Sequence, residues 1–235
     1  MEIKAILFDL DGTLLPMDQD EFVKVYFKLL AVKLAPLGYE TEKLVESIWA
    51  GTAAMVKNDG SSLNETVFWN SFCEIYGKEA IKDKGVIDAF YSQEFGQARA
   101  VCGYAPEAKD VVELAKRHGR LVVLATNPIF PAVATENRMS WAGISKDDFV
   151  YYTTYENSRY SKPNPKYYLE ILEKIGCRPE ECLMVGNDVA EDMIAESLGM
   201  KVFLLTDCLI NKKNTDISGY EQGGFKELKE YLHTI

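Results

Sequence analysis

The chain has few residues that commonly bind transition metals, and it has no long apolar run. Only two histidines occur, His118 and His233, and the five cysteines are scattered without a C-x-x-C pair. We therefore expect neither a zinc site nor a disulfide framework. No stretch approaches the ~20 uninterrupted apolar residues that a membrane-spanning helix needs, so no membrane partner is expected.

Positive charge is scarce as well. The 26 lysines and arginines are outnumbered by 36 acidic residues, which gives a formal net charge of −10. The phosphates of nucleic acid would repel such a chain, so non-specific nucleic-acid binding is not expected. The N-terminal residues lack the pattern of a signal peptide, and cleavage of one would remove the first predicted strand. We therefore expect a cytoplasmic protein.

The spacing of apolar residues divides the chain into two parts. Residues 3–8 predict a buried strand, and from about residue 104 short β-rich runs alternate with helical patterns. This alternation predicts an α/β fold, a Rossmann-like parallel sheet with helices on both faces, formed by residues 1–15 and 104–235. Residues 16–103 show helical spacing without a strong strand, which predicts an inserted all-helical cap domain of three to five helices.

Capping signals locate individual helices. Asn164 and Pro165 mark the start of one helix, and Gly176 marks its end. Ser62 and Glu65 have the spacing of a capping box, which predicts a helix with Ser62 as its N-cap.

Two further helices are expected from the apolar spacing. One covers residues 78–95, with a break at Gly85, and the other covers residues 190–199.

Polar side chains follow several of the predicted strands or lie in the neighbouring loops. They are Asp9, Asp11, Thr126, Asn127, Lys162, Asp188 and Asp192. Ligands of open parallel sheets bind beyond the carboxyl ends of the strands, so we expect these side chains to share one rim. Four carboxylates there would repel one another, and a hard divalent cation such as Mg²⁺ would relieve the repulsion. With Lys162 beside them, the rim suits a phosphate dianion.

Four short motifs occur in a fixed order along the chain. They are D-L-D-G-T-L at residues 9–14, the apolar run ending at Thr126, the lysine of S-K-P-N-P at Lys162, and G-N-D-V-A-E-D at residues 186–192. Together they resemble the motifs of the haloacid dehalogenase-like hydrolase superfamily. The resemblance covers roughly residues 1–15 and 104–210, and the helical segment between them is similar to the C1-type cap of that superfamily.

The resemblance implies a Mg²⁺-dependent phosphatase that hydrolyses a small-molecule phosphate monoester through an aspartyl-phosphate. Asp9 would be the nucleophile and a metal ligand. Asp11 would protonate the leaving oxygen and then act as the base for water, and its main-chain carbonyl would bind the metal. Asp188 would ligate Mg²⁺, and Asp192 would support the ion directly or through water.

The remaining motif residues would bind the phosphoryl group. Thr126 and the main-chain N–H of Asn127 would contact its oxygens, and Lys162 would neutralise charge on it and on the nucleophile. Many relatives have Gly-Asp where this chain has Gly186-Asn187-Asp188. We assign the metal to Asp188, and Asn187 stays a rival for a contact at the rim.

Three alternative functions remain open at this point. A receiver-like phosphoryl switch uses similar residues, although in a different order and in a shorter chain. A 2-haloacid dehalogenase shares the fold but lacks the second aspartate, and a sugar phosphomutase uses the same aspartates while excluding water. Substrate selectivity is expected to come from the cap, where the turn at residues 57–60 is a candidate.

Overall fold

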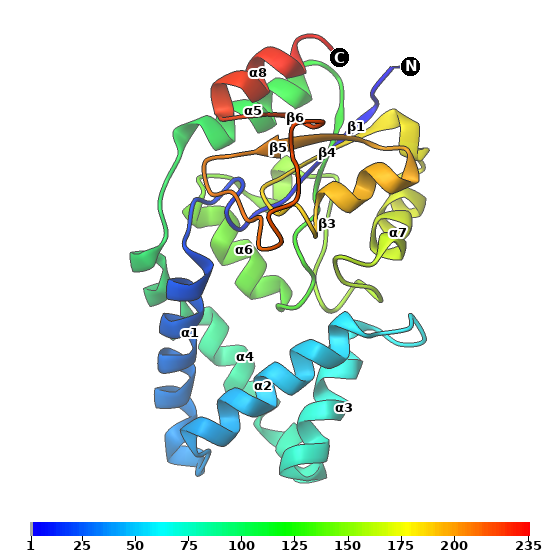
Figure 1. Ribbon diagram of the computed structural model, residues 1–235. Helices are drawn as coiled ribbons and strands as arrows, with labels where there is room; N and C mark the ends of the chain where they lie inside the picture. The colour runs from blue at the N-terminus through cyan, green and yellow to red at the C-terminus, as the bar shows by residue number, and fades with distance from the viewer. Residues whose placement is uncertain (1) are drawn as a thin grey trace.

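A parallel sheet forms the centre of the molecule, as a computed structural model describing residues 2–235 shows (Figure 1). Its strands run in the order β3-β2-β1-β4-β5-β6, and all neighbours pair in parallel. Their bounds are β1 Ala5–Phe8, β2 Leu121–Leu124, β3 Tyr151–Tyr152, β4 Cys182–Gly186, β5 Lys201–Leu205 and β6 Glu221–Gly223. The predicted α/β fold class is confirmed.

Side chains of β1 alternate between two apolar layers, as the period of two in a strand requires. Ile6 and Phe8 belong to a cluster that includes residues of α5 (Pro106–Arg117), α6 (Ala132–Trp141) and α8 (Phe225–Leu232). Ala5 and Leu7 belong to a second cluster, which includes residues of α7 (Pro165–Ile175). Helices therefore cover both faces of the sheet, which confirms the predicted layers.

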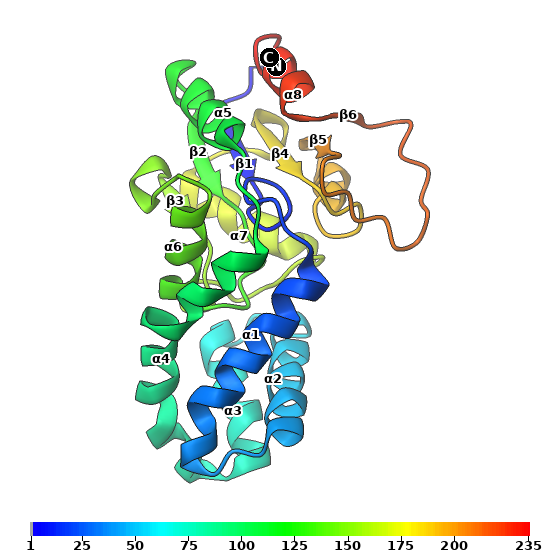
Figure 2. The ribbon, with the colours of Figure 1, turned by 90° about the vertical axis from the view of Figure 1, so that its left-hand side faces the viewer.

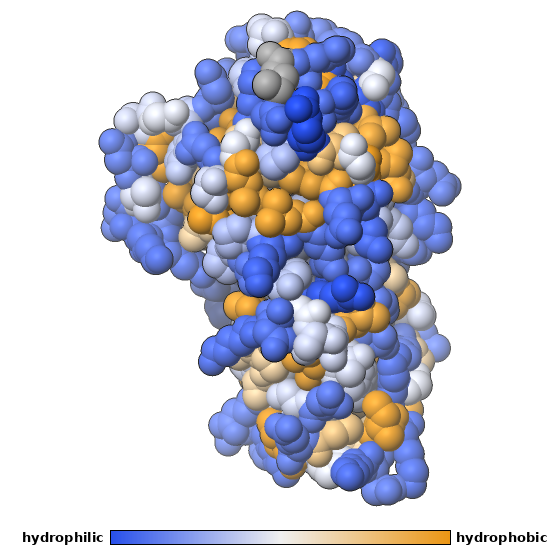
Figure 3. Space-filling view, turned by 90° about the vertical axis from the view of Figure 1, so that its right-hand side faces the viewer, coloured by the Kyte–Doolittle hydropathy of each residue, from blue (hydrophilic) through white to orange (hydrophobic). Residues whose placement is uncertain are grey.

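The segment between β1 and α5 is helical. It contains α1 (Gln19–Leu34), α2 (Thr41–Val56), α3 (Asn64–Tyr76) and α4 (Lys84–Ser92), with 3₁₀ segments at Ala35–Leu37, Lys78–Asp83 and Glu94–Val101. These helices gather on the side to which the strands' carboxyl ends point (Figures 1 and 2). From the side, they form a separate lower part of the molecule with polar and apolar residues intermixed on its surface (Figure 3).

One apolar cluster continues from the sheet into these helices. Tyr26 of α1 and Phe130 of the loop after β2 lie with their ring centroids 5.5 Å apart, and Phe95 packs 6.3 Å from Phe130. Because the two parts share this cluster, the predicted division into a core of residues 1–15 and 104–235 and a cap of residues 16–103 stays a prediction. Within residues 2–235, no helix is both long and apolar enough to cross a bilayer.

The predicted capping box at Ser62 is wrong. Helix α3 begins at Asn64, and its N-cap residue Leu63 makes no side-chain cap. The N–H groups of Asn64 and Glu65 donate instead to the main-chain carbonyls of Ser158 and Tyr155, at 2.9 and 2.8 Å. Carbonyls from a distant loop thus satisfy the first turn, which a local sequence pattern does not reveal.

Of the other predicted helices, one is confirmed and two differ in type or extent. The helix starting at Pro165 is confirmed, with the Asn164 side chain accepting from Lys166 N and Gly176 in the left-handed region. The expected helix over residues 78–95 is a 3₁₀ segment, Lys78–Asp83, followed by α4, and Gly85 is the second residue of α4, next to the predicted break. The segment predicted as a helix over 190–199 is the short 3₁₀ helix η6 (Met193–Leu198). The elements β6 and α8 were not predicted.

Candidate active site

Sheet register places Asp9 between two neighbouring strand ends. Asp9 N donates to Val185 O of β4 at 2.9 Å, and Ala125 N, after β2, donates to Phe8 O at 2.7 Å. The residues that follow β1, β2 and β4 therefore meet at one edge. The strand order reverses direction between β1 and β4, which is where open α/β sheets bind their ligands.

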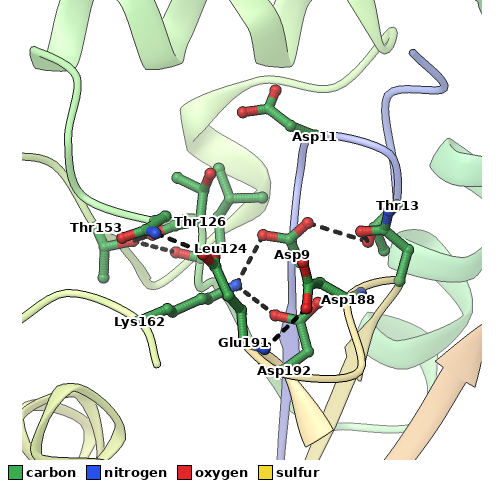
Figure 4. A network of polar contacts seen from close by, with 12 residues as sticks. Asp9, Asp11, Thr13, Leu124, Thr126, Thr153, Lys162, Asp188, Glu191 and Asp192 are labelled. Carbon is green, nitrogen blue, oxygen red and sulfur yellow. Dashed lines mark hydrogen bonds and ion pairs between the residues drawn. The ribbon is translucent and has the colours of Figure 1, made fainter. Parts of the chain in front are cut away.

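Lys162 joins two carboxylates beneath this edge (Figure 4). Its Nζ lies 2.8 Å from Asp9 Oδ1 and 2.6 Å from Asp192 Oδ1, and the Lys162 side chain is only 1% exposed. Burial disfavours the ammonium, but the charges of Asp192 and Asp9 outweigh it and raise the pKa of Lys162 well above its ordinary value. Lys162 is therefore a fixed positive charge beside the Asp9 carboxylate.

The loop after β1 is shaped by Gly12. Its φ is +82°, and a Cβ there would lie 2.3 Å from Asn187 Nδ2, so a side chain would collide. Thr13 Oγ1 lies 3.1 Å from Asp9 Oδ2 and 3.0 Å from Asn187 Oδ1. Asn187 also donates to Cys208 O at 2.7 Å. Asn187 thus lines the site and holds the Asp9 loop against the loop that contains Cys208.

Asp188 and Asp192 lie one turn apart but have different surroundings. Asp188 Oδ1 accepts from Ala190 N and Glu191 N, whereas Asp192 Oδ2 accepts from Asp188 N at 3.0 Å. Asp192 therefore uses both oxygens within the protein, one on Lys162 and one on Asp188. A Cβ at Gly186 would lie 2.2 Å from the Asp192 carboxylate, so glycine at the end of β4 makes room for this arrangement.

Thr126 and Asn127 follow β2 on the other side of Asp9. The carbonyl of Thr126 accepts from Thr153 Oγ1 at 2.6 Å and from Tyr167 OH at 2.9 Å, which fixes this loop. Asn127 Nδ2 donates to Glu191 Oε2 at 3.0 Å. Within residues 2–235, the main-chain N–H of Asn127 has no acceptor, so it is available to a ligand.

Asp11 pairs with an arginine that the sequence analysis did not identify. Its Oδ2 accepts from Arg138 Nη1, and Figure 4 shows its side chain directed away from the cluster of Asp9 and Lys162. Burial raises the pKa of Asp11, and the Arg138 charge opposes that rise. Arg138 is 1% exposed and lies 4.5 Å from the centroid of the Phe130 ring.

A cavity of about 150 Å³ collects the predicted site residues. Asp9, Asp11, Thr126, Asn127, Asp188 and Asp192 line it, together with Asn187 and Glu191. Lys162 does not line it and lies behind Asp9. Glu191 was not identified from the sequence. The turn at residues 57–60, a candidate for selectivity, does not line this cavity.

The residues at the cavity fit a magnesium ion. Asp188 Oδ2 and the main-chain carbonyl of Asp11 accept no hydrogen bond within residues 2–235, and the Asp9 carboxylate lies beside them in the cavity wall. The described chain gathers no set of three or more His, Cys, Asp or Glu side chains of the kind that encloses a metal. Mg²⁺ typically uses one or two carboxylates and completes its shell with water and substrate phosphate, so this donor set suits it.

Comparisons with known proteins identify the family. A model described as haloacid dehalogenase-like hydrolase matches residues 3–196. The chain belongs to the haloacid dehalogenase-like hydrolases and is an enzyme of that family, as its motifs predicted.

Individual relatives agree with this assignment. A glyceraldehyde 3-phosphate phosphatase from Methanothermobacter thermautotrophicus is 25% identical over 245 residues, covering 98% of this chain and 100% of the relative. A phosphoglycolate phosphatase from Vibrio vulnificus is 27% identical over 205 residues, a match that covers 87% of this chain and 84% of the relative. A solved structure of a 2-haloacid dehalogenase from Pseudomonas syringae pv. Tomato shares the fold, with a TM-score of 0.65, 19% identity and 99% coverage of both chains.

Proposed function

We propose that this enzyme is a Mg²⁺-dependent phosphatase that hydrolyses a small-molecule phosphate monoester through an aspartyl-phosphate intermediate. The observation that carries the proposal is the Asp9 carboxylate, which lines the cavity and is held by the buried Lys162 ammonium. Asp11, Thr126 and Asp188 line the same cavity. The phosphatase names of two relatives support the same reaction class.

In the first half of the proposed reaction, an oxygen of Asp9 forms a bond to phosphorus while the bond from phosphorus to the ester oxygen breaks. Asp11 donates a proton to the departing oxygen. In the second half, Asp11 takes a proton from water as the water oxygen attacks phosphorus, which frees inorganic phosphate and the Asp9 carboxylate. Asp11 thus ends each cycle in the protonation state in which it began.

Charge on the transferring group is stabilised by fixed donors. The N–H of Asn127 is free to donate to a phosphoryl oxygen, and Lys162 neutralises charge on Asp9 from behind the cavity, so little reorganisation is needed during the reaction. A Mg²⁺ ion held by Asp9, Asp188 and the Asp11 carbonyl would supply further positive charge against the phosphoryl oxygens. We assign Asp192 the role of orienting Lys162 and Asp188, because both its oxygens bond to them.

A dehalogenase fits the cavity less well. A 2-haloacid dehalogenase lacks the second aspartate, whereas this chain has Asp11, which lines the cavity. A sugar phosphomutase or a receiver-like switch would also phosphorylate Asp9. Release of inorganic phosphate over many turnovers distinguishes hydrolysis from both.

Replacing the two aspartates tests the mechanism. Asp9→Asn should reduce turnover to background without a trapped phosphoenzyme, because an amide attacks phosphorus poorly. Asp11→Asn should lose on the order of 10²–10⁴-fold, less on aryl than on alkyl phosphates, and should accumulate phosphoenzyme because water lacks its base. Full activity of Asp9→Asn, or an Asp11→Asn loss equal for both leaving groups without accumulation, would contradict these roles.

Removing the metal tests the cofactor. Exhaustive chelation should abolish turnover, and added Mg²⁺ should restore it. Ca²⁺ should inhibit, because its longer and looser coordination disturbs the alignment of nucleophile and phosphorus. Asp188→Ala should require more Mg²⁺ for half-maximal activity, and unchanged turnover after chelation would rule out the metal.

We also propose that the enzyme works in the cytoplasm on a small phosphorylated molecule. All five cysteines are free thiols, as expected in a reducing compartment.

A further inference from the structure

A second, apolar cavity adjoins the active site. It measures about 70 Å³ and shares Val23, Ile129 and Phe130 with the active-site cavity as lining residues. It lies among the cap helices and the loop that follows Asn127. These three residues form the boundary between the two cavities, so a substituent directed from a phosphoryl group at Asp9 past the side chain of Phe130 would reach the apolar cavity.

Helical spacing produces the apolar walls of this cavity. Val23, Tyr26 and Phe27 lie three and four residues apart on α1 and so share one face. From α2 and α3 come further large side chains: Ile48, Trp49, Phe68 and Trp69. Trp49 is 50% exposed at the rim although it is a large apolar residue, which makes it available to a ligand.

Several polar atoms in this wall are already bonded within the protein, whereas Trp69 Nε1 has no partner among the described residues. The hydroxyls of Tyr26 and Tyr91 lie 2.8 Å apart, and Thr52 Oγ1 donates to Ile48 O at 2.9 Å. A sugar or glycerol group with several hydroxyls would lose water in this cavity and find the Trp69 indole N–H as a donor for one of its oxygens, so most of its hydroxyls would stay without a partner.

Charge excludes a second anionic group even more strongly. Among the described residues, neither cavity is lined by Lys, Arg or His, whereas Asp188 and Glu191 line the active-site cavity. The nearest buried cations are already paired, Lys162 with two carboxylates and Arg138 with Asp11. A carboxylate or second phosphate on the substrate would thus find no cation and would meet carboxylates.

We propose that the physiological substrate is a phosphate monoester whose leaving group is apolar, a single ring or a short branched alkyl group. This inference rests on the proposed function and names its substrate class. Hydrolysis breaks the bond between phosphorus and the ester oxygen, joins the water oxygen to phosphorus, and releases the apolar alcohol and inorganic phosphate. The apolar cavity measures about 70 Å³, whereas an apolar cavity of about 150 Å³ holds one benzene, so the leaving group is at most a single ring that stays partly in the active-site cavity.

Benzyl phosphate and ethyl phosphate provide the direct comparison. Both leave as primary alcohols of similar acidity, so a difference between them reports the fit of the ring. We expect kcat/KM to be at least tenfold higher for benzyl phosphate, because a hydrophobic pocket gives about that factor for even one methylene and the ring adds several carbons. Phosphoglycolate should be poorer than ethyl phosphate. Equal or lower kcat/KM for benzyl phosphate, or a preference for phosphoglycolate, would overturn the inference.

Two substitutions in the cavity wall, at Thr52 and Trp49, test the proposal, and Ala53→Arg outside the wall is the matched control for Thr52→Arg. Thr52→Arg should reduce kcat/KM for benzyl phosphate about tenfold or more and leave ethyl phosphate much less affected. Ala53→Arg, on the next and exposed position of α2, places the same charge outside the cavity and should change neither value. Trp49→Ala removes a half-exposed side chain, so the fold should tolerate it while the benzyl preference declines. Retention of the full preference in both wall variants would contradict the proposal.

Binding separates this inference from the proposed function. Benzylphosphonate should bind to the magnesium-loaded enzyme at least tenfold more tightly than methylphosphonate, as calorimetry would measure. If no phosphate ester is hydrolysed but this difference persists, the proposed reaction fails and the apolar subsite stands. If esters are hydrolysed and the two phosphonates bind equally, the subsite fails and the phosphatase stands.

Discussion

Arg138 is the buried residue with the closest connection to Asp11. It also contacts Ala134 O through Nε and the face of Phe130, so its guanidinium is fixed on three sides. Phe130 lines both cavities. The Arg138 side chain therefore both orients Asp11, the proposed proton carrier, and supports Phe130 in the cavity wall.

We predict that Arg138→Met lowers kcat on alkyl phosphates on the order of tenfold, less than the 10²–10⁴-fold assigned to loss of the acid and base itself. KM should change little, because Arg138 does not line the cavity. Arg138→Lys should recover part of the loss. The exposed Arg99, replaced by Met, serves as the control.

A double-mutant cycle shows whether Arg138 acts through Asp11. In the Asp11→Asn background, Arg138→Met should add almost nothing to the loss of kcat, since contacting residues that act together are non-additive. Additive losses would mean that Arg138 has only a structural role.

The sequence identified the residues that belong to contiguous motifs, and the structure places them around one cavity. Asp9, Thr126 and Asp188 each follow an apolar strand, so strand order alone predicts their meeting. Arg138 has no such signal, because it lies on α6 and meets Asp11 only through the tertiary fold. Glu191 lies inside the fourth motif but has no position that distinguishes it from a solvated acid.

At the scale of elements, the first turn of α3 connects the helical segment to the two loops that contain Asn127 and Lys162. Asn64 is fully buried, and its Nδ2 donates to Pro128 O at 3.2 Å and to Ser161 Oγ at 3.1 Å. Pro128 follows Asn127 and Ser161 precedes Lys162. A change in the position of α3 would thus move Asn127 and Lys162, the residues proposed to stabilise the phosphoryl group.

We predict that Asn64→Ala destabilises the protein by about 1–3 kcal/mol, because it leaves buried partners without a hydrogen bond. Activity should decline as well, through looser positioning of Asn127 and Lys162. Asn70→Ala on the exposed side of α3 is the matched control. Denaturant unfolding and kcat/KM measured on both variants check this, and identical values for the two would disprove the connection.

Elements with strong local signals were predictable, and those shaped by tertiary contacts were not. The helix from Pro165 has an N-cap asparagine, a proline and a terminal glycine, so each of its ends is specified locally. The N-terminus of α3 depends on carbonyls of the loop at Tyr155 and Ser158, and its predicted start was therefore wrong. The strand β6 has only three residues, two of them Glu221 and Gly223, with little strand propensity.

At the scale of the whole molecule, a pair of ionic contacts at the far end of the sheet contributes to the pH dependence of stability. Glu181 accepts from Lys4 Nζ at 2.7 Å and from Arg178 Nη2 at 3.0 Å. Hydrogen bonds from Arg178, then from Lys4, lower the pKa of Glu181 to about 2 from an ordinary value of 4.5. A depressed pKa stabilises the folded state above pH 4.5, and this stabilisation is lost as the pH falls towards 2.

We predict that Glu181→Gln is less stable than the unsubstituted enzyme at pH 7 and that the difference shrinks between pH 4.5 and 2. Glu173→Gln, at an exposed position of α7, should show no such difference. Thermal unfolding at pH 7, 5 and 3 measures both variants. A gap for Glu181→Gln that stays constant over this range would contradict the assignment.

The position of β1 in the sheet also determines when the enzyme becomes active during its synthesis. Ala5 pairs with Leu121 on one side and Cys182 on the other, so the strand that carries Asp9 leaves the ribosome long before either partner. The helices of residues 19–101 can form before these partners are made, because contacts within a continuous segment form early. Until then the apolar β1 has no partner strand, and unpaired strands are prone to aggregation. The proposed nucleophile Asp9 therefore emerges from the ribosome first, and the proposed site can be complete only after Asp192 has emerged.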